Sequence, residues 1–305
     1  MTEYRASFDA QVTFSNGGDL AVHGFRVDVP SPDVDEAAIA ALFVASLGLL
    51  MTETVRLRNV EVFAEQHKGT RGGPADRAEG GPVPGGQLIE LSHVIRPGLI
   101  TYPGLPGPVI TPYLTREASR SRYAPGTEFA IDEITMVGNT GTYLDAPYHR
   151  FADGHDLAGI PLERTADLPA LVIRVTGSRQ REVGVGSLPA AGVRGKAVLL
   201  HTGDAVRFGT PQYAEDACFL GRDGAAWLAE HDPALVGIDA VNIDDVADGE
   251  RPAHTLLLAA GIPVVEHLTG LDQLPPAGAS FTAVPLRIQG FGTIPVRAFA
   301  RLPAG

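Results

Sequence analysis

The sequence predicts an α/β protein in which strands outnumber helices, built as a strand-rich domain preceded by a small ββαβ unit. Short runs of Val, Ile and Leu, separated by Gly and Pro, recur from residue 87 onward, and helical spacing appears between only a few of them. This pattern favours a mixed sheet over the doubly wound fold, in which strands and helices alternate regularly. The chain shows no internal repeat and no glycine-rich phosphate-binding loop.

Residues 1–67 are expected to form the small ββαβ unit. Apolar and polar residues alternate over residues 8–14 and 20–29, on either side of Asn16-Gly-Gly, which is typical of a β-hairpin whose turn needs positive φ angles. Helical spacing of apolar residues follows over about residues 34–50, and alternation returns in the next stretch. The unit contains no cluster of reactive side chains. It could pack on the second domain, mediate self-association or cover an active-site mouth.

Residues 68–86 are dominated by Gly and Pro and lack apolar periodicity, so they are expected to form a linker. The domain of residues 87–305 follows, and it carries the chemically informative motifs. Within it, apolar runs predict strands at residues 88–91, 170–175, 197–200, 235–238, 262–265 and 281–288. Helical patterns predict helices at residues 223–230 and 243–248.

The composition narrows the class of function. With 24 Lys and Arg against 36 Asp and Glu, the formal net charge is -12, and no basic stripe is present; this argues against nucleic-acid binding. The longest apolar run is too short to cross a bilayer, and the N-terminus lacks a signal-peptide pattern. We therefore expect a cytoplasmic protein that acts on a small molecule and binds neither nucleic acid nor membrane. The single cysteine, Cys218, is interpreted as a buried thiol.

The most informative segment is Gly141-Thr-Tyr-Leu-Asp-Ala-Pro-Tyr-His149, with Asn139 just ahead of it. Glycine permits a sharp backbone path, and Pro147 forces the residue before it into an extended conformation. Asp145 and His149 are therefore expected where a strand passes into a loop, and not on a helix. A carboxylate and an imidazole this close in sequence suit either a metal site or a general base with its orienting partner.

A second acid–imidazole pair, His254 and Glu266, lies twelve residues apart nearer the C-terminus. With both pairs in place, the chain resembles the cyclase or kynurenine formamidase-like metal hydrolases. Members of that family carry His-Thr-Gly-Thr-His-x-Asp-x-Pro-x-His, where this chain reads Asn139-Thr-Gly-Thr-Tyr-Leu-Asp-Ala-Pro-Tyr-His149. The resemblance covers about residues 87–302. It implies the swivelling β/β/α fold and a homo-oligomer, either a dimer or a tetramer.

Carried over residue by residue, the resemblance implies three metal ligands and one acid or base: Asp145, His254, Glu266 and His149. Two further ligand positions, both His in the family, hold Asn139 and Tyr143 here. An amide oxygen and a phenol with a pKa of about 10 are weaker zinc ligands than imidazole. We therefore expect one divalent metal instead of two. The ion could be Mn, Mg or Zn, and an oxygen-rich donor set favours the first two.

The leading hypothesis is a hydrolase or cyclase that acts at an amide, lactam or similar carbonyl carbon of a small molecule, aromatic ones included. The alternative is a metal-independent cyclase or dehydratase, in which His149 is the general base and Tyr143 and Asn139 donate hydrogen bonds to a developing oxyanion. A non-catalytic ligand-binding remnant of the family is the third hypothesis. Side chains near the motifs are expected to line the substrate pocket, namely Tyr102, Tyr148, Phe151 and His201.

Overall fold

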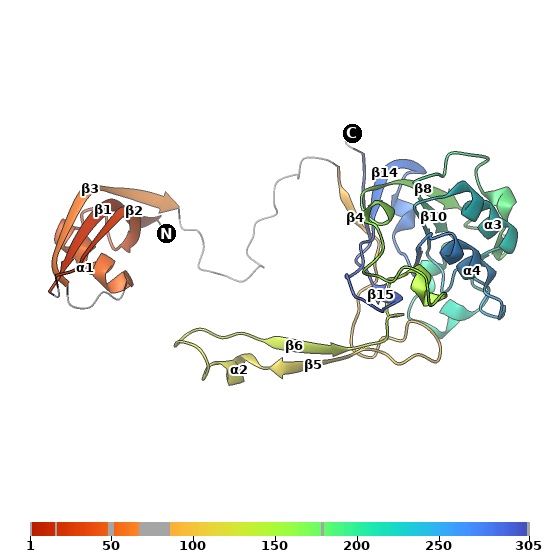
Figure 1. Ribbon diagram of the computed structural model, residues 1–305, viewed down its shortest axis with the longest axis horizontal. Helices are drawn as coiled ribbons and strands as arrows, with labels where there is room; N and C mark the ends of the chain where they lie inside the picture. Colours follow the sequence, from red (N-terminus) through yellow and green to blue (C-terminus); the bar gives the residue numbers. More distant parts are fainter. Residues whose placement is uncertain (1, 16, 48–51, 67–85, 178–179, 304–305) are drawn as a thin grey trace. The chain divides into compact units, whose positions relative to one another are not determined.

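The computed structural model describes residues 2–15, 17–47, 52–66, 86–177 and 180–303 (Figure 1). The chain divides into two compact units, Met1–Pro82 and Val83–Gly305, and each is described by itself. The linker expected over residues 68–86 lies outside the described residues, except for Gly86.

The N-terminal unit has the predicted ββαβ order: β1 (Thr2–Phe14), β2 (Asp19–Val29), α1 (Glu36–Leu47) and β3 (Thr52–Gln66). Its three strands form an antiparallel sheet in the order β2-β1-β3. Gly17 adopts a φ of +84° in the hairpin turn, as the sequence predicts. Alternate side chains of β1 are buried against α1, where the rings of Phe8 and Phe43 meet edge to face with centroids 5.5 Å apart. The expected hairpin and helix are therefore confirmed.

Nine strands of the second unit form one mixed sheet in the order β15-β7-β13-β12-β10-β8-β14-β16-β4. Their bounds are β4 (Leu88–Glu90), β7 (Tyr143–Asp145), β8 (Leu168–Arg174), β10 (Ala197–His201), β12 (Leu235–Ile238), β13 (Val264–Glu266), β14 (Ala277–Thr282), β15 (Thr293–Pro295) and β16 (Phe299–Arg301). The central strands β13, β12, β10 and β8 are parallel, and the strands on both sides are antiparallel. This arrangement confirms the strand-rich α/β class.

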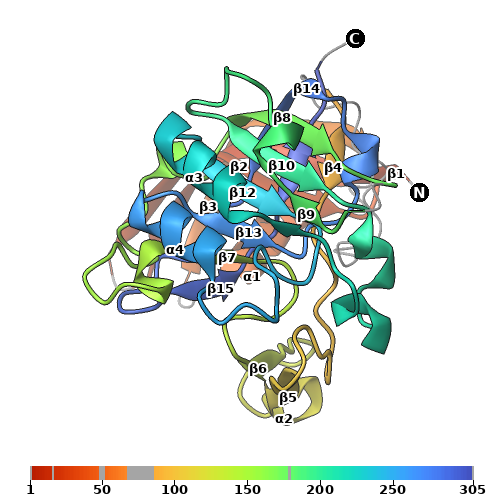
Figure 2. The ribbon, with the colours of Figure 1, turned by 90° about the vertical axis from the view of Figure 1, so that its right-hand side faces the viewer.

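Strands β10, β12 and β13 are buried on both faces, which explains why the sequence shows them as continuous apolar runs. Val198 and Leu200 face a core shared with α3 (Arg222–His231) and α4 (Pro252–Ala259), which cover one face of the sheet (Figure 2). Leu199 points to the other face, where loop residues complete a second core. Among the described residues, no helix is both long and apolar enough to cross a membrane.

Two predictions for this unit are wrong. Residues 243–248 form turns instead of a helix, because the side chains of Asp245 and Asp248 accept hydrogen bonds from Ala247 N and Glu250 N and so compete with helical bonding. The strand expected over residues 281–288 ends at Thr282, and Pro285, which lacks a backbone donor, follows soon after. The nearby helix α4 is not expected from the sequence.

A two-stranded arm extends away from the nine-stranded sheet (Figures 1 and 2). It consists of β5 (Val109–Leu114) and β6 (Ile131–Thr135), joined through the short helix α2 (Arg116–Ser119). Every residue of these two strands is exposed except Leu114. A separate parallel pair consists of β9 (Glu182–Val183) and β11 (Phe219–Leu220), and α3 follows β11 in the sequence.

Candidate active site

The short strand β7 brings the two carboxylates of the site, Asp145 and Glu266, onto one face of the sheet. Tyr143 pairs across the sheet with Glu266 of β13, and Asp145 pairs with Thr293 of β15. Residues two apart on one strand, and residues directly opposite on neighbouring strands, share a face of the sheet. These four side chains therefore point the same way, and each is at most 5% exposed.

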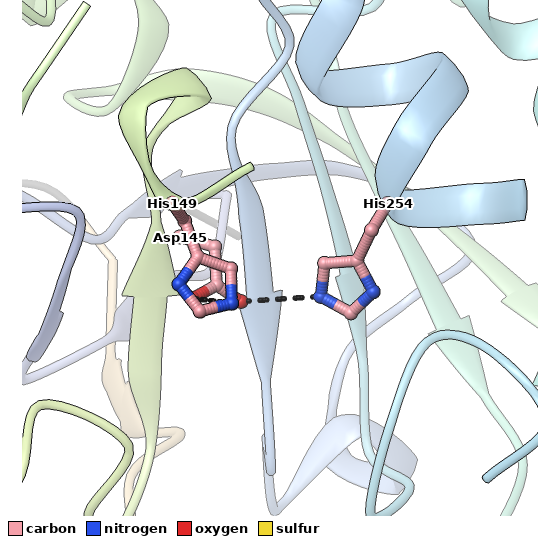
Figure 3. Close-up of side chains that lie close together, drawn as sticks. All are labelled: Asp145, His149 and His254. Carbon is pink, nitrogen blue, oxygen red and sulfur yellow. Dashed lines mark ion pairs between the residues drawn. The ribbon is translucent and has the colours of Figure 1, made fainter. Parts of the chain in front are cut away.

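Two imidazoles reach the same place from other elements (Figure 3). His149 ends a 3-10 turn that follows β7, and His254 lies in the first turn of α4. His149 Nε2 lies 3.9 Å from Asp145 Oδ1, and His254 Nε2 lies 3.5 Å from Asp145 Oδ2. Gly292 makes room for His149, because a Cβ at that position would lie 2.8 Å from the His149 backbone. The structure thus brings the expected acid and both imidazoles together.

Thr293 fixes the tautomer of His149. Its hydroxyl lies 2.6 Å from Asp145 Oδ1 and 2.8 Å from His149 Nδ1. A hydroxyl has one proton, and an ionised carboxylate can only accept, so Thr293 donates to Asp145 and accepts from Nδ1–H of His149. Neutral His149 therefore carries its lone pair on Nε2, which makes this nitrogen a base.

His254 is surrounded by carboxylates. Asp244 Oδ2 accepts a hydrogen bond from His254 Nδ1 at 2.6 Å, and the His254 Nε2 atom lies 3.5 Å from Glu266 Oε1. Burial by itself disfavours the charged ring, but Glu266, Asp145 and Asp244 together raise the pKa of His254 to about 10. The ring is a cation whenever Nε2 keeps its proton.

The phenol of Tyr143 is held as a neutral donor. Its hydroxyl donates to Glu266 Oε2 at 2.5 Å, and Ile243 N donates to Glu266 Oε1 at 2.6 Å. Burial, reinforced by the Glu266 and Asp145 carboxylates, raises the pKa of Tyr143 well above its usual value, and hydrogen bonding by Asn139 opposes this rise only in part. Burial also raises the pKa of Glu266 to about 7. Tyr143 is therefore not available as a phenolate ligand.

Burial opposes the ionisation of Asp145 too, but its neighbours have the stronger effect. Contacts with His254 and His149 and the hydroxyl of Thr293 hold the pKa of Asp145 below its usual value. This carboxylate is therefore the permanently charged member of the site. It carries the negative charge on which both imidazoles converge.

A cavity of about 400 Å³ opens over these groups. Its lining includes six of the residues predicted for catalysis, metal binding or substrate binding, namely Tyr102, Asn139, Tyr143, His149, His254 and Glu266. Tyr148 lines a shallower hollow on the other side of His149. The two remaining predicted substrate-binding residues do not line the cavity. Phe151 packs against the core beneath α3 and α4, and His201 Nε2 lies 4.0 Å from Asp239 Oδ2 at the end of β10.

The donor set fits a divalent cation. Asp145 Oδ2 is buried and, among the residues that the structure describes, has no hydrogen-bond partner. Ligand atoms about 2.0–2.2 Å from a shared ion lie roughly 3.0–3.6 Å from one another, which matches the 3.5 Å from His254 Nε2 to the Asp145 and Glu266 oxygens. The Asp244 contact would orient His254, as carboxylates commonly do for metal-bound imidazole. Asp145 and His254 also form, with His149, a group whose ligand atoms all lie within 4.8 Å of one another.

Two residues that organise the site have no signal in the sequence. Thr293 lies in an unremarkable Gly-Thr-Ile-Pro stretch, and only the register of β15 against β7 places it beside Asp145. Asp244 lies in the segment expected to be helical, ten residues before His254. A carboxylate shortly before a predicted helix start would have indicated a helix cap, had α4 been expected.

Comparison with known proteins identifies the family of the chain. Residues 89–245, just over half of the chain, match the model of the family described as "Putative cyclase". A kynurenine formamidase from Geobacillus thermodenitrificans is 30% identical over 214 residues, which cover 70% of this chain and 96% of that protein.

Two solved structures share the fold of the second unit. Isatin hydrolase A from Labrenzia aggregata bound to benzyl benzoate aligns with a TM-score of 0.60 at 22% identity, covering 72% of this chain and 94% of that one. A "predicted metal-dependent hydrolase" from Bacillus stearothermophilus aligns with a TM-score of 0.55 at 25% identity, covering 70% and 97%. The family match begins after the N-terminal unit. The resemblance seen in the sequence is confirmed, and the chain belongs to the cyclase family.

Proposed function

We propose that this protein hydrolyses the C–N bond of an amide or lactam in a small aromatic molecule, with the help of one divalent cation. The observation that carries the proposal is the His149 imidazole, whose unprotonated Nε2 is fixed by Thr293 beside Asp145 at the edge of the cavity. The names of the relatives, a kynurenine formamidase and an isatin hydrolase, support this reaction class and the aromatic substrate.

In this proposal, His149 removes a proton from the attacking water at Nε2 and returns it to the leaving nitrogen. Asp145 and His254 would hold the cation, with Glu266 as a third ligand. When bound, the cation supplies polarisation of the substrate carbonyl and lowers the pKa of water. Asn139 lines the cavity as a hydrogen-bond donor for the substrate, and Tyr143, whose proton is donated to Glu266, lines it beside Asn139.

A metal-independent cyclase or dehydratase is the second candidate, and one observation favours it. With a pKa raised to about 10, His254 can itself supply a positive charge between the Asp145 and Glu266 carboxylates. The neutral Tyr143 phenol would then turn its proton from Glu266 to the substrate oxygen and donate a hydrogen bond there. This arrangement suits enolisation or ring closure better than amide cleavage.

The test measures hydrolysis of N-formyl aromatic amides and of isatin by EDTA-treated protein, before and after addition of Mn²⁺, Mg²⁺ or Zn²⁺. The proposal predicts turnover that depends on the added ion and is lost in His149→Gln. The matched control is His155→Gln, which changes an exposed imidazole outside the cavity lining and should retain turnover. Ion-independent turnover that still needs His149 would favour the second candidate. Binding without turnover would indicate a non-catalytic remnant.

Two further proposals concern the domains and the assembly of the chain. We propose that residues 87–305 form the catalytic domain, and that the protein is a homo-oligomer. The oligomer is supported by the exposed apolar side chains of the arm, among them Tyr113 at 72% and Phe129 at 54% exposure, since such side chains commonly mark protein–protein contacts. Location in the cytoplasm stays a prediction.

A further inference from the structure

The guanidinium of Arg251 lines the catalytic cavity without a charged partner. Its four contacts are all to neutral acceptors: Asp245 O at 3.1 Å, Val246 O at 3.3 Å, and both Asn242 Oδ1 and Tyr102 OH at 3.4 Å. Only the first lies within the usual N–H···O range. Arg251 forms no ion pair with any residue that the structure describes. Nη1 and Nη2 make all four contacts, and three of these are longer than a usual hydrogen bond, so a carboxylate would offer the guanidinium shorter, charge-assisted bonds.

The lack of a partner is not caused by a shortage of acids. The chain has 36 Asp and Glu against 24 Lys and Arg, and four acidic residues lie within seven positions of Arg251. Their side chains are engaged elsewhere: Asp244 pairs with His254, Asp245 with Arg181 and Glu250 with Arg222, and Asp248 accepts a hydrogen bond from Glu250 N. The positive charge of Arg251 is therefore left for a group that enters the cavity.

The backbone holds Arg251 at this position. It directly precedes α4, with a φ of +49°, an uncommon left-handed conformation for a residue other than glycine. The N–H groups of Ala253 and His254, at the start of α4, both donate to Asp244. The helix terminus is thus already occupied by an anion, and the free site is the guanidinium itself.

The charges of the cavity are divided in space. Asp145 and Glu266 place negative charge at the catalytic floor, whereas Arg251 and Arg150 belong to the lining, as does Glu250, whose carboxylate is paired with Arg222. Arg150, like Arg251, forms no ion pair within the described part of the chain, and it lies over the ring of Phe151. A substrate with a carbonyl near His149 would be favoured if it carried a single negative charge directed toward Arg251. The acidic floor disfavours a more highly charged group.

We propose that Arg251 is a specificity-determining residue that binds a carboxylate carried by the substrate, an inference that rests on the proposed hydrolysis. The planar fork of a guanidinium matches the two oxygens of a carboxylate, and such paired, charge-assisted bonds are directional as well as strong. The preferred substrates are then acidic aromatic amides, and their neutral analogues are poor substrates.

Binding of anthranilate and of anthranilamide, measured by calorimetry, tests the proposal with probes of almost equal shape. The unaltered protein should bind the carboxylate about 10- to 100-fold more tightly than the amide, a preference that weakens with added salt. In Arg251→Met the preference should disappear, and in Arg251→Lys it should be intermediate. The matched control is Arg194→Met, which removes an exposed guanidinium paired with Asp232 and should keep the preference.

Hydrolysis of N-formylanthranilate and of its carboxamide provides the second measurement. The preference should appear in KM, and Arg251→Met should raise KM for the acid far more than it lowers kcat. Equal or absent binding of the two probes by the unaltered protein overturns the proposal, as does an unchanged preference in a folded Arg251→Met. A third outcome separates this proposal from the proposed function. If neither formyl compound is hydrolysed, but the unaltered protein binds anthranilate more tightly than anthranilamide and Arg251→Met does not, the proposed hydrolysis is wrong and the carboxylate site is supported.

Discussion

The Thr293 hydroxyl provides the sharpest test of how the site is organised. Thr293→Val keeps the shape of the side chain but removes both hydrogen bonds, at 2.6 Å to Asp145 Oδ1 and at 2.8 Å to His149 Nδ1. A hydrogen bond to a charged group contributes about 1.5–3 kcal/mol. Loss of the hydrogen bond to Asp145 raises the pKa of Asp145. Loss of the hydrogen bond to His149 lets the proton of His149 move from Nδ1 to Nε2, the nitrogen that must act as base.

Since 1.4 kcal/mol corresponds to a factor of ten, kcat/KM of Thr293→Val should fall by about 10- to 100-fold. The assay is hydrolysis of an N-formyl aromatic amide, and ¹⁵N NMR of His149 should show a shift from the Nδ1–H tautomer to a mixture. Thr293→Ser keeps the hydroxyl and loses a methyl group, so it should lose stability but keep both the tautomer and most of the activity. Unchanged turnover and tautomer in Thr293→Val would refute the assignment, as would an equal loss in Thr293→Ser.

Three further predictions concern the metal, pH and assembly. Asp244→Asn should weaken Mn²⁺ binding in calorimetry by about 10- to 100-fold, because the carboxylate that orients His254 is lost. EDTA-treated protein should melt at progressively lower temperature as pH rises from about 6 to 10, because the folded state raises the pKa of Glu266 to about 7 and of His254 to about 10. The folded state loses its extra protons over this range, and a flat melting profile there would contradict the prediction. Tyr113→Asp combined with Phe129→Asp should reduce the oligomer to monomer in sedimentation, while an unchanged mass would exclude the arm as the interface.

Strands with a strong local pattern are predictable from the sequence. The parallel strands β10 and β12 are buried on both faces, so each appears as an uninterrupted apolar run with turn residues at its ends. The hairpin of the N-terminal unit is equally clear, because one face of β1 is buried and the other is not. In these elements, local pattern and tertiary burial agree.

Helix α4 is not predicted from the sequence, because its local pattern is weak. It begins with Pro252 and is apolar around much of its surface, so it shows little periodicity. The Asp-rich segment before it has the length of a helical turn but bonds to its own backbone. The predicted helix was therefore placed just ahead of the real one.

Only the site residues that belong to a recognisable sequence motif can be predicted from the sequence. Asp145 and His149 belong to one short segment, and His254 and Glu266 were found by their spacing from it. Thr293 and Arg251 carry no such signal. The role of Thr293 depends on the register of β15 against β7. The role of Arg251 depends on which neighbouring carboxylates already have partners. Both are properties of the tertiary structure.

The most direct test of the account is a titration of EDTA-treated protein with Mn²⁺ in which bound metal and turnover are followed together. A single centre at Asp145 and His254 predicts that hydrolysis rises in proportion to bound metal and saturates at one equivalent per chain. Saturation at two equivalents, or full turnover with no bound metal, would contradict it.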